Sequence, residues 1–334
     1  MKTKRTCSLI LLVTGYWLLV TFLNGCTPTY PKEKFKECIL EVCKKEYKVD
    51  VKVGAAGKTV AIYLPLENLL DFTFAITKEA SEHINDVLLS VSRVSLSTDA
   101  DYDFYVIIAH DIRIPEIQIV IIKSVDDVKR FMLNDISRGE YGKRMLIDLR
   151  MNPQAQKERA VKEIFQKMNL DKKWQEDVMN DFFRAEPTAL SDIGYWNNRF
   201  YVKDIAMTEF LAEQVASRIK IDFREDKKLS DAFSVKSSKG RYLDKNGKRY
   251  FQFDLSIGPG SPEALVDENY PGRILEEALK IAVNVLRGYF FEDYDYIEIV
   301  NQADKKMIRV SREDAERFRT KKIKFKDILI EGIA

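Results

Sequence analysis

Short apolar runs and stretches with helical periodicity alternate along the chain after residue 48. The runs are five to eight residues long, which is typical of buried strands, whereas apolar residues at i, i+3, i+4 and i+7 indicate one face of a helix. After an N-terminal helix at Glu33–Lys48, a turn is expected at Ala55–Lys58. Strands are predicted at Val60–Leu66, Tyr102–Ala109, Ile117–Ile122 and Met145–Leu149, and helices at Val125–Leu133 and around Ile84, Val87, Leu88 and Val91.

The C-terminal part repeats this order of elements. Asp244–Lys248 contains Asn-Gly, the strongest short signal for a hairpin turn. The segment Ile274–Leu286 is apolar on most faces of a helix, which predicts a central position. Strands are predicted at Tyr250–Ile257, Tyr296–Val300, Lys306–Val310 and Ile328–Glu331, and a short helix at Arg312–Arg319.

Local identities between the two parts favour an internal duplication. The pattern Ser-x-x-Asp-x-x-Arg-Phe occurs at residues 124–131 and again at 311–318. Serine before an acidic first turn is typical of a helix N-terminus. Gly57-Lys58 also matches Gly247-Lys248, and Tyr102-Asp103 matches Tyr294-Asp295. We therefore predict an α+β fold with two related ββαββαβ-type lobes; chance similarity between two common αβ patterns is the alternative.

A different region, residues 152–240, separates the two predicted lobes. Helices are expected at Gln156–Met168, Lys172–Arg184 and Lys203–Ile221, followed by an exposed polar loop at Arg224–Gly240. The aromatic residues of this helical insert could bind a partner or pack the insert onto the lobes. The candidate partner-binding residues are Trp174, Phe182, Phe183 and Trp196.

The N-terminus has the two parts of an export signal. Lys2, Lys4 and Arg5 are followed by an apolar run over Ser8–Leu23. The closing residues, Leu23–Cys26, resemble the lipobox of bacterial lipoproteins. That run is shorter than the roughly 20 residues that span a bilayer, which argues against an uncleaved anchor. An anchor and an ordinary cleaved signal are the alternatives.

The resemblance implies that Cys26 is acylated and becomes the mature N-terminus. Acyl chains on this residue would bind membrane lipid and hold the rest of the chain in water. Thr27 follows where the enterobacterial sorting rule has Asp for retention, which favours an outer membrane in a diderm host. The predicted organisation is a signal peptide (1–25), lipidated cysteine, tether and helix (26–48), first lobe (49–151), helical insert (152–240) and second lobe (241–334).

Composition indicates a globular chain without an electrostatic case for nucleic acid. Hydrophobic residues make up 46% of 334 residues, and 54 basic residues nearly balance 52 acidic ones. Cys38 and Cys43 fall in the first predicted helix. An oxidising compartment permits a bridge between them, but five helical positions separate the Cα atoms by roughly 8–9 Å, beyond the usual limit. Both alternatives, bridge and free thiols, stay open.

Known catalytic and metal-binding patterns are not matched. Gly54–Thr59 lacks the first glycine of a phosphate loop and precedes a strand, so it reads as a hairpin turn. Asp99–Asp103 resembles the opening of a calcium loop without its glycine and final glutamate, which favours solvated acids. The only two histidines, His83 and His110, form no zinc pattern. No cofactor and no metal are predicted.

The leading expectation is a non-catalytic envelope interaction or assembly factor with a protein partner. A ligand-binding protein that uses a cleft between the lobes is one alternative, because domain junctions favour pockets. A cell-wall hydrolase that uses carboxylates is the other.

Overall fold

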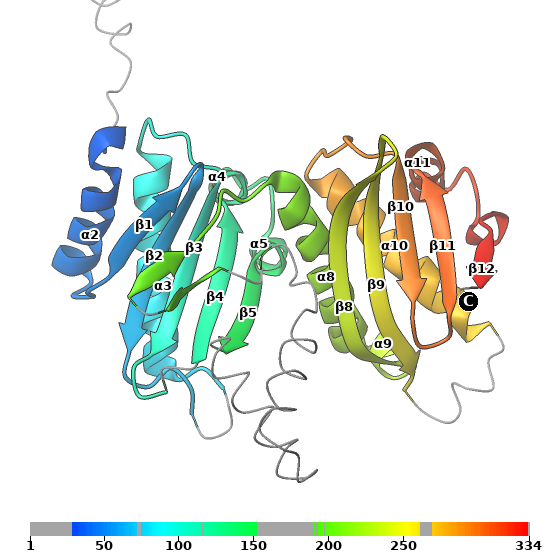
Figure 1. Cartoon of the computed structure of the whole chain (residues 1–334), viewed down its shortest axis with the longest axis horizontal. Helices are drawn as coiled ribbons and strands as arrows, with labels where there is room; N and C mark the ends of the chain where they lie inside the picture. The colour runs from blue at the N-terminus through cyan, green and yellow to red at the C-terminus, as the bar shows by residue number, and fades with distance from the viewer. Residues whose placement is uncertain are drawn as a thin grey trace, which may run out of the picture.

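The computed structural model describes residues 29–71, 75–114, 117–151, 190, 193–196, 198–260 and 269–332. In this part of the chain it is a mixed α+β fold with eight α-helices and three sheets. Two five-stranded sheets lie side by side, with helix α8 (Met207–Glu225) between them (Figure 1). The predicted fold class is therefore confirmed at the level of α+β.

The first sheet has the order β1-β2-β3-β4-β5, and only the β2–β3 pair among these strands is parallel. Helix α3 makes the crossover between those two strands, and α4 and α5 lie between β4 and β5. The bounds are β1 Lys52–Ala56, β2 Thr59–Leu66, α3 Lys78–Leu96, β3 Phe104–Asp111, β4 Ile117–Ser124, α4 Val125–Met132, α5 Arg138–Lys143 and β5 Leu146–Met151.

Both faces of the first sheet are buried, which explains its continuous apolar runs. One face packs against α3 and against α2 (Phe35–Glu46), which follows the short 3-10 helix η1 (Lys32–Lys34). The other face, which includes Phe104, joins a larger core with α8 and the second sheet. Phe104 and Phe210 of α8 lie 5.0 Å apart between ring centroids.

The second sheet has the order β12-β11-β10-β9-β8, and only the β9–β10 pair among these strands is parallel. Its strand β9 alternates buried and half-buried residues, as expected for a sheet with one face on the core. The bounds are α9 Lys227–Ser230, β8 Phe233–Lys245, β9 Lys248–Pro259, α10 Tyr270–Gly288, β10 Tyr296–Asn301, β11 Lys306–Ser311, α11 Arg312–Arg319, η3 Phe325–Asp327 and β12 Ile330–Gly332.

The prediction of an exposed loop over residues 224–240 is wrong, because strand β8 begins at Phe233. This strand is mostly polar and has no apolar run, yet it pairs with β9 from Phe233 to Lys245, apart from a bulge at Lys236. Its backbone also passes so close to α8 that a Cβ on Gly240 would collide with the carbonyl of Ala212. Lysines and polar residues suit a strand at the edge of a sheet.

The sequence also did not predict a small hairpin that consists of β6 (Gly194–Trp196) and β7 (Arg199–Tyr201). It lies on the first sheet, where the ring of Tyr195 stacks on Tyr63 at 3.9 Å. The side chain of Gln118 bonds both the N–H and the carbonyl of Tyr195. The helix expected at Lys203–Ile221 is confirmed as α8, and those at 156–168 and 172–184 lie outside the described residues.

None of the helices in the described ranges combines the length and the apolar character that crossing a membrane requires.

Candidate functional site

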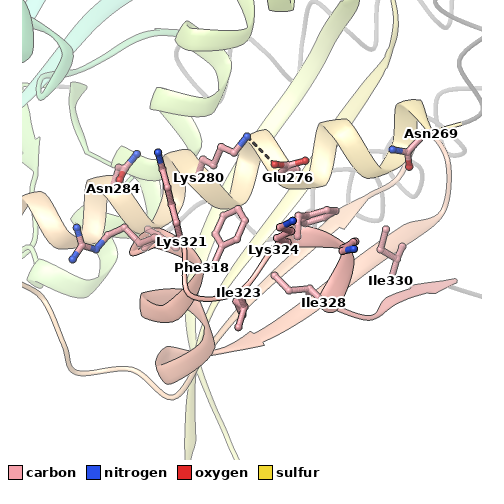
Figure 2. Close-up of a pocket in the computed structure, with 14 residues that line it drawn as sticks. Asn269, Glu276, Lys280, Asn284, Phe318, Lys321, Ile323, Lys324, Ile328 and Ile330 are labelled. Atoms are coloured by element: carbon pink, nitrogen blue, oxygen red, sulfur yellow. Dashed lines mark ion pairs between the residues drawn. The ribbon is translucent and has the colours of Figure 1, made fainter.

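An open groove of about 710 Å³ lies between α10, the end of α11 and the chain that leads to β12 (Figure 2). Helix α10 forms one wall, and residues 318–330 form the other. Strands β10 and β11 separate the two walls along the chain, and α10 and α11 both pack on the second sheet, which holds the walls in position.

Apolar side chains form the floor of the groove. Phe318 at the end of α11 is buried, and its ring meets Phe325 edge-on at 6.2 Å between centroids. Val283 of α10 is also buried. The apolar lining residues are Val283, Phe318, Ile323, Phe325, Ile328 and Ile330.

Basic residues alternate with these apolar residues along one wall. In the sequence Lys-Lys-Ile-Lys-Phe-Lys, residues 321–326, Ile323 and Phe325 join the core while the lysines are exposed. Lys321 adopts a left-handed backbone conformation with φ 60°, and its N–H bonds to the carbonyl of Phe318. This conformation ends α11 and turns the chain back along the groove.

The charge on the rim is only partly neutralised. Lys280 forms ion pairs of 2.9 Å with both Glu276 and Glu277, and Arg319 pairs with Glu316 at 2.6 Å. Burial works against the charge of Lys280, but its carboxylate partners raise the pKa. By contrast, three further lining residues have no ion pair with any described residue: Lys321, Lys324 and Lys326.

These features define what the groove can do. Among the described lining residues, five basic side chains stand against one acidic side chain, and none is a histidine, cysteine, serine or threonine. Such a surface can hold an anionic, partly apolar chain segment, because apolar burial supplies affinity and charge supplies specificity.

A second cluster of charged groups joins α4 and α5 to α10 and α8. The Asp127 carboxylate accepts hydrogen bonds from Arg144 at 2.8 Å and from the Tyr289 hydroxyl at 2.6 Å. Glu140 pairs with Arg144 and with both terminal nitrogens of Arg218. Burial beside Asp127 raises the pKa of Tyr289, which keeps its hydroxyl as a donor.

Lys123 extends this cluster into the first sheet. Its side chain is fully buried, and its Nζ lies 3.0 Å from the ring centroid of Tyr141. Burial lowers the pKa of Lys123 to about 7, although the charge of Asp127 opposes this shift. Closely packed polar contacts fill the cluster, and we interpret it as a junction between the two sheets.

A small pocket of about 190 Å³ lies between β5, α8 and β8. Small-molecule sites commonly have volumes of about 300–1,000 Å³. This pocket is smaller than that range, and a ligand-binding cleft between the lobes stays a prediction.

Several residues singled out from the sequence have packing roles. Trp196 is only 9% exposed in β6 and meets Tyr201 edge-on at 6.4 Å between centroids. A partner-binding role for Trp196 stays a prediction. Cys38 and Cys43 lie in the unbroken helix α2, and both are free thiols. The remaining candidates, Cys26, Trp174, Phe182 and Phe183, lie outside the described residues.

The acidic run at 99–103 is engaged by other groups. Asp101 and Asp103 form ion pairs with Lys58 at 2.7 and 3.7 Å, and Asp99 accepts the backbone N–H of Lys32. His110 has a partner that the sequence did not reveal, because its Nδ1 lies 2.8 Å from the Tyr63 hydroxyl. Among the described residues, no group of three or more His, Cys, Asp or Glu could hold a metal.

Sequence reasoning missed the groove, although one signal could have found it. The alternation of lysines with Ile323 and Phe325 is unusual for a chain end that closes a sheet, and it indicates an amphipathic surface. The opposite wall could not be assigned, since its last lining residue on α10, Asn284, precedes Lys321 by 37 residues in the sequence.

Comparison of the chain with protein-family models, with curated proteins and with solved structures yields no match.

Proposed function

We propose that this chain is a membrane-anchored bacterial lipoprotein that acts as a non-catalytic interaction or assembly factor in the cell envelope. The groove beside α10 would hold an acidic, partly apolar segment of a protein partner. The observation that carries this proposal is the apolar floor bordered by three lysines without ion pairs in the described structure. The lipobox-like residues and acylated Cys26 would supply the anchor.

Charge and lining favour a protein segment over a lipid chain. Eight of the 14 lining residues are polar or charged, so an acyl chain would contact many groups that it cannot satisfy. A bilayer surface is too broad to enter a concave groove. A peptide presents carboxylates and apolar side chains together, and it can match both features.

We also propose that the two sheets arose by duplication, as the sequence predicts. Each sheet has a single parallel pair of strands with a helical crossover, and in each a short helix directly follows the fourth strand along the chain. Asp103 and Asp295 support the relationship. The backbone carbonyl of Asp103 accepts the first N–H of α4, and that of Asp295 accepts the first N–H of α11, both at 2.9 Å.

One of the sequence identities, the match of Gly57-Lys58 with Gly247-Lys248, does not fall at equivalent positions of the two hairpin turns. The first hairpin turn is Gly57-Lys58, because Ala56 pairs with Thr59. The second turn is Asn246-Gly247, because Lys245 pairs with Lys248. Turn position therefore aligns Gly57 with Asn246, and the Gly-Lys match is shifted by one residue.

The proposed partner is tested by photo-cross-linking in native membranes. A photoreactive amino acid replaces Ile323 in the groove, and the control replaces Lys44, an exposed residue of α2 whose side chain is 76% exposed. We expect cross-links from Ile323 to an Asp/Glu-rich peptide of one envelope protein, and none to that protein from Lys44.

Charge reversal sharpens this test. The triple change Lys321→Glu, Lys324→Glu and Lys326→Glu should abolish the cross-link, and raised salt should weaken it. The matched control reverses three lysines of the first helix region, Lys32, Lys36 and Lys44. Equal capture by both triple variants would overturn the groove as the binding surface.

A further inference from the structure

A second cavity, of about 570 Å³, lies on the opposite side of α11 from the groove. Val283 lines both cavities, and the neighbouring residues Lys321 and Lys322 line one each. The C-terminal end of α11 therefore separates two hollows that share a border. The second cavity is more aromatic than the groove, with Phe290, Phe291 and Tyr294 in its lining.

Phe290 has an unusual backbone and an unusual exposure. Its φ is 54°, and its side chain is 69% exposed. It follows α10 at the position where a left-handed residue ends the helix: its N–H bonds to Arg287, and the N–H of Phe291 bonds to Leu286. Glycine is the usual residue there, and a bulky side chain in this conformation carries a cost.

Two guanidinium groups hold the Phe290 ring. Arg130 lies 5.5 Å and Arg287 lies 5.7 Å from its centroid. Arg130 also donates a 2.6 Å hydrogen bond to the carbonyl of Gly288. Phe290 thus combines a strained backbone with an exposed aromatic ring that two guanidinium groups contact. These are the properties of an interface anchor.

The acidic groups of the second cavity are mostly occupied. Glu292 pairs with Arg287 at 3.6 Å, and Glu316 pairs with Arg319 at 2.6 Å. Lys322 has no ion pair with a residue in the described ranges. The basic rim of the groove thus continues around the C-terminal end of α11. The partial negative charge of a helix C-terminus stabilises cationic side chains there, and these side chains can bind an acidic partner.

We infer that the two cavities form one bipartite site. The acidic partner segment would lie in the groove, pass the C-terminal end of α11 and place an apolar or aromatic side chain against Phe290. This inference rests on the proposed function and deepens it, since it specifies a segment with acidic residues at one end and an apolar residue at the other.

The test adds a second photoreactive position, which replaces Phe290 in the full chain in native membranes. We expect the same protein at both positions, with the cross-linked sites of that protein in one acidic stretch of its sequence. Capture at Ile323 with no capture, or a different protein, at Phe290 would overturn the bipartite site and leave the proposed function standing. No capture at either position would overturn both.

The substitution Phe290→Gly separates a binding role from a structural one. We expect it to reduce capture at Ile323 about tenfold, as loss of an interface anchor does, while the midpoint of thermal unfolding stays equal or rises because the strain is released. The control is Asn246→Gly, another left-handed position with φ 57°, which should leave capture unchanged. A fall in the unfolding midpoint of more than about 2 °C for Phe290→Gly, or unchanged capture, would overturn the inference.

Discussion

Two short helices with the same sequence pattern, α4 and α11, lie in opposite environments. Each follows a strand that ends in serine, and each has Asp at its third residue. Asp127 of α4 is fully buried and bonded to Arg144 and Tyr289. Asp314 of α11 is 44% exposed and pairs within its own helix with Arg317.

The two helices also differ in the residue that precedes the serine, which is charged in one case and apolar in the other. Lys123 precedes Ser124, and Val310 precedes Ser311; both are buried. The first sheet thus buries charge where the second buries an apolar side chain. The difference follows from the neighbours: α4 packs against α3 and α5 and bonds to the end of α10, whereas α11 stands at the rim of two cavities. One pattern can therefore serve a junction in one place and an open surface in the other.

The largest expected effect comes from breaking the buried pair. Asp127→Ala should lower the free energy of unfolding by about 3 kcal/mol, because the buried Arg144 would keep only Glu140 as a carboxylate partner and the Tyr289 hydroxyl would lose its acceptor. Asp314→Ala should cost less than about 1 kcal/mol, as exposed pairs do. Urea unfolding at pH 7 measures both, and similar losses for the two variants would contradict the assignment of Asp127 to a buried junction.

A second contrast concerns two glycines. A Cβ on Gly240 of β8 would meet backbone of α8, whereas a Cβ on Gly54 of β1 would lie 2.9 Å from the movable ring of Phe200. We expect Gly240→Ala to cost about 3 kcal/mol and Gly54→Ala less than about 1 kcal/mol. Denaturant midpoints and slopes distinguish the two, and a harmless Gly240→Ala would contradict the tight packing of β8 on α8.

We expect the free energy of unfolding to depend on pH through the buried Lys123, whereas Val310 at the equivalent position cannot titrate. The Lys123 pKa of about 7 in the folded state lies below the value of about 10.4 in the unfolded chain. Between these values the unfolded chain binds more protons, so stability rises with pH, by about 2 kcal/mol between pH 7 and pH 9.

The control for this prediction is Lys123→Met, which keeps much of the side-chain volume. Its free energy of unfolding should lack the rise, so the difference between the two proteins should change with pH. A difference that stays constant from pH 6 to pH 9 would show that Lys123 does not titrate in this range.

The smallest effect concerns helix caps. The Ser311 hydroxyl accepts the N–H of Asp314 at 3.1 Å, and Ser124 makes no such bond. Ser311→Ala should cost about 1 kcal/mol, and Ser124→Ala should cost less. Thermal unfolding can rank the two variants; the reverse order would show that the cap in α4 forms in solution.

Much of the secondary structure was predictable because its signals are local. The apolar runs of β2, β3, β4, β10 and β11 and the caps and periodicity of α4, α10 and α11 all appear in consecutive residues. Helix α11 has the predicted bounds, Arg312–Arg319. The polar strand β8 and the hairpin of β6 and β7 were missed because their partners, β9 and the first sheet, define them more than their own residues do.

The sequence determined the α+β class, the order of most elements and the amphipathic alternation at 321–326, since propensity and periodicity act over short distances. Only the tertiary structure decided that Asp127 is a junction residue and Asp314 a surface residue, and that Phe290 stands exposed beside Arg130. These outcomes depend on contacts between segments more than 100 residues apart, such as Asp127 with Tyr289. Burial and charge pairing over such separations are set by packing, which no local pattern encodes.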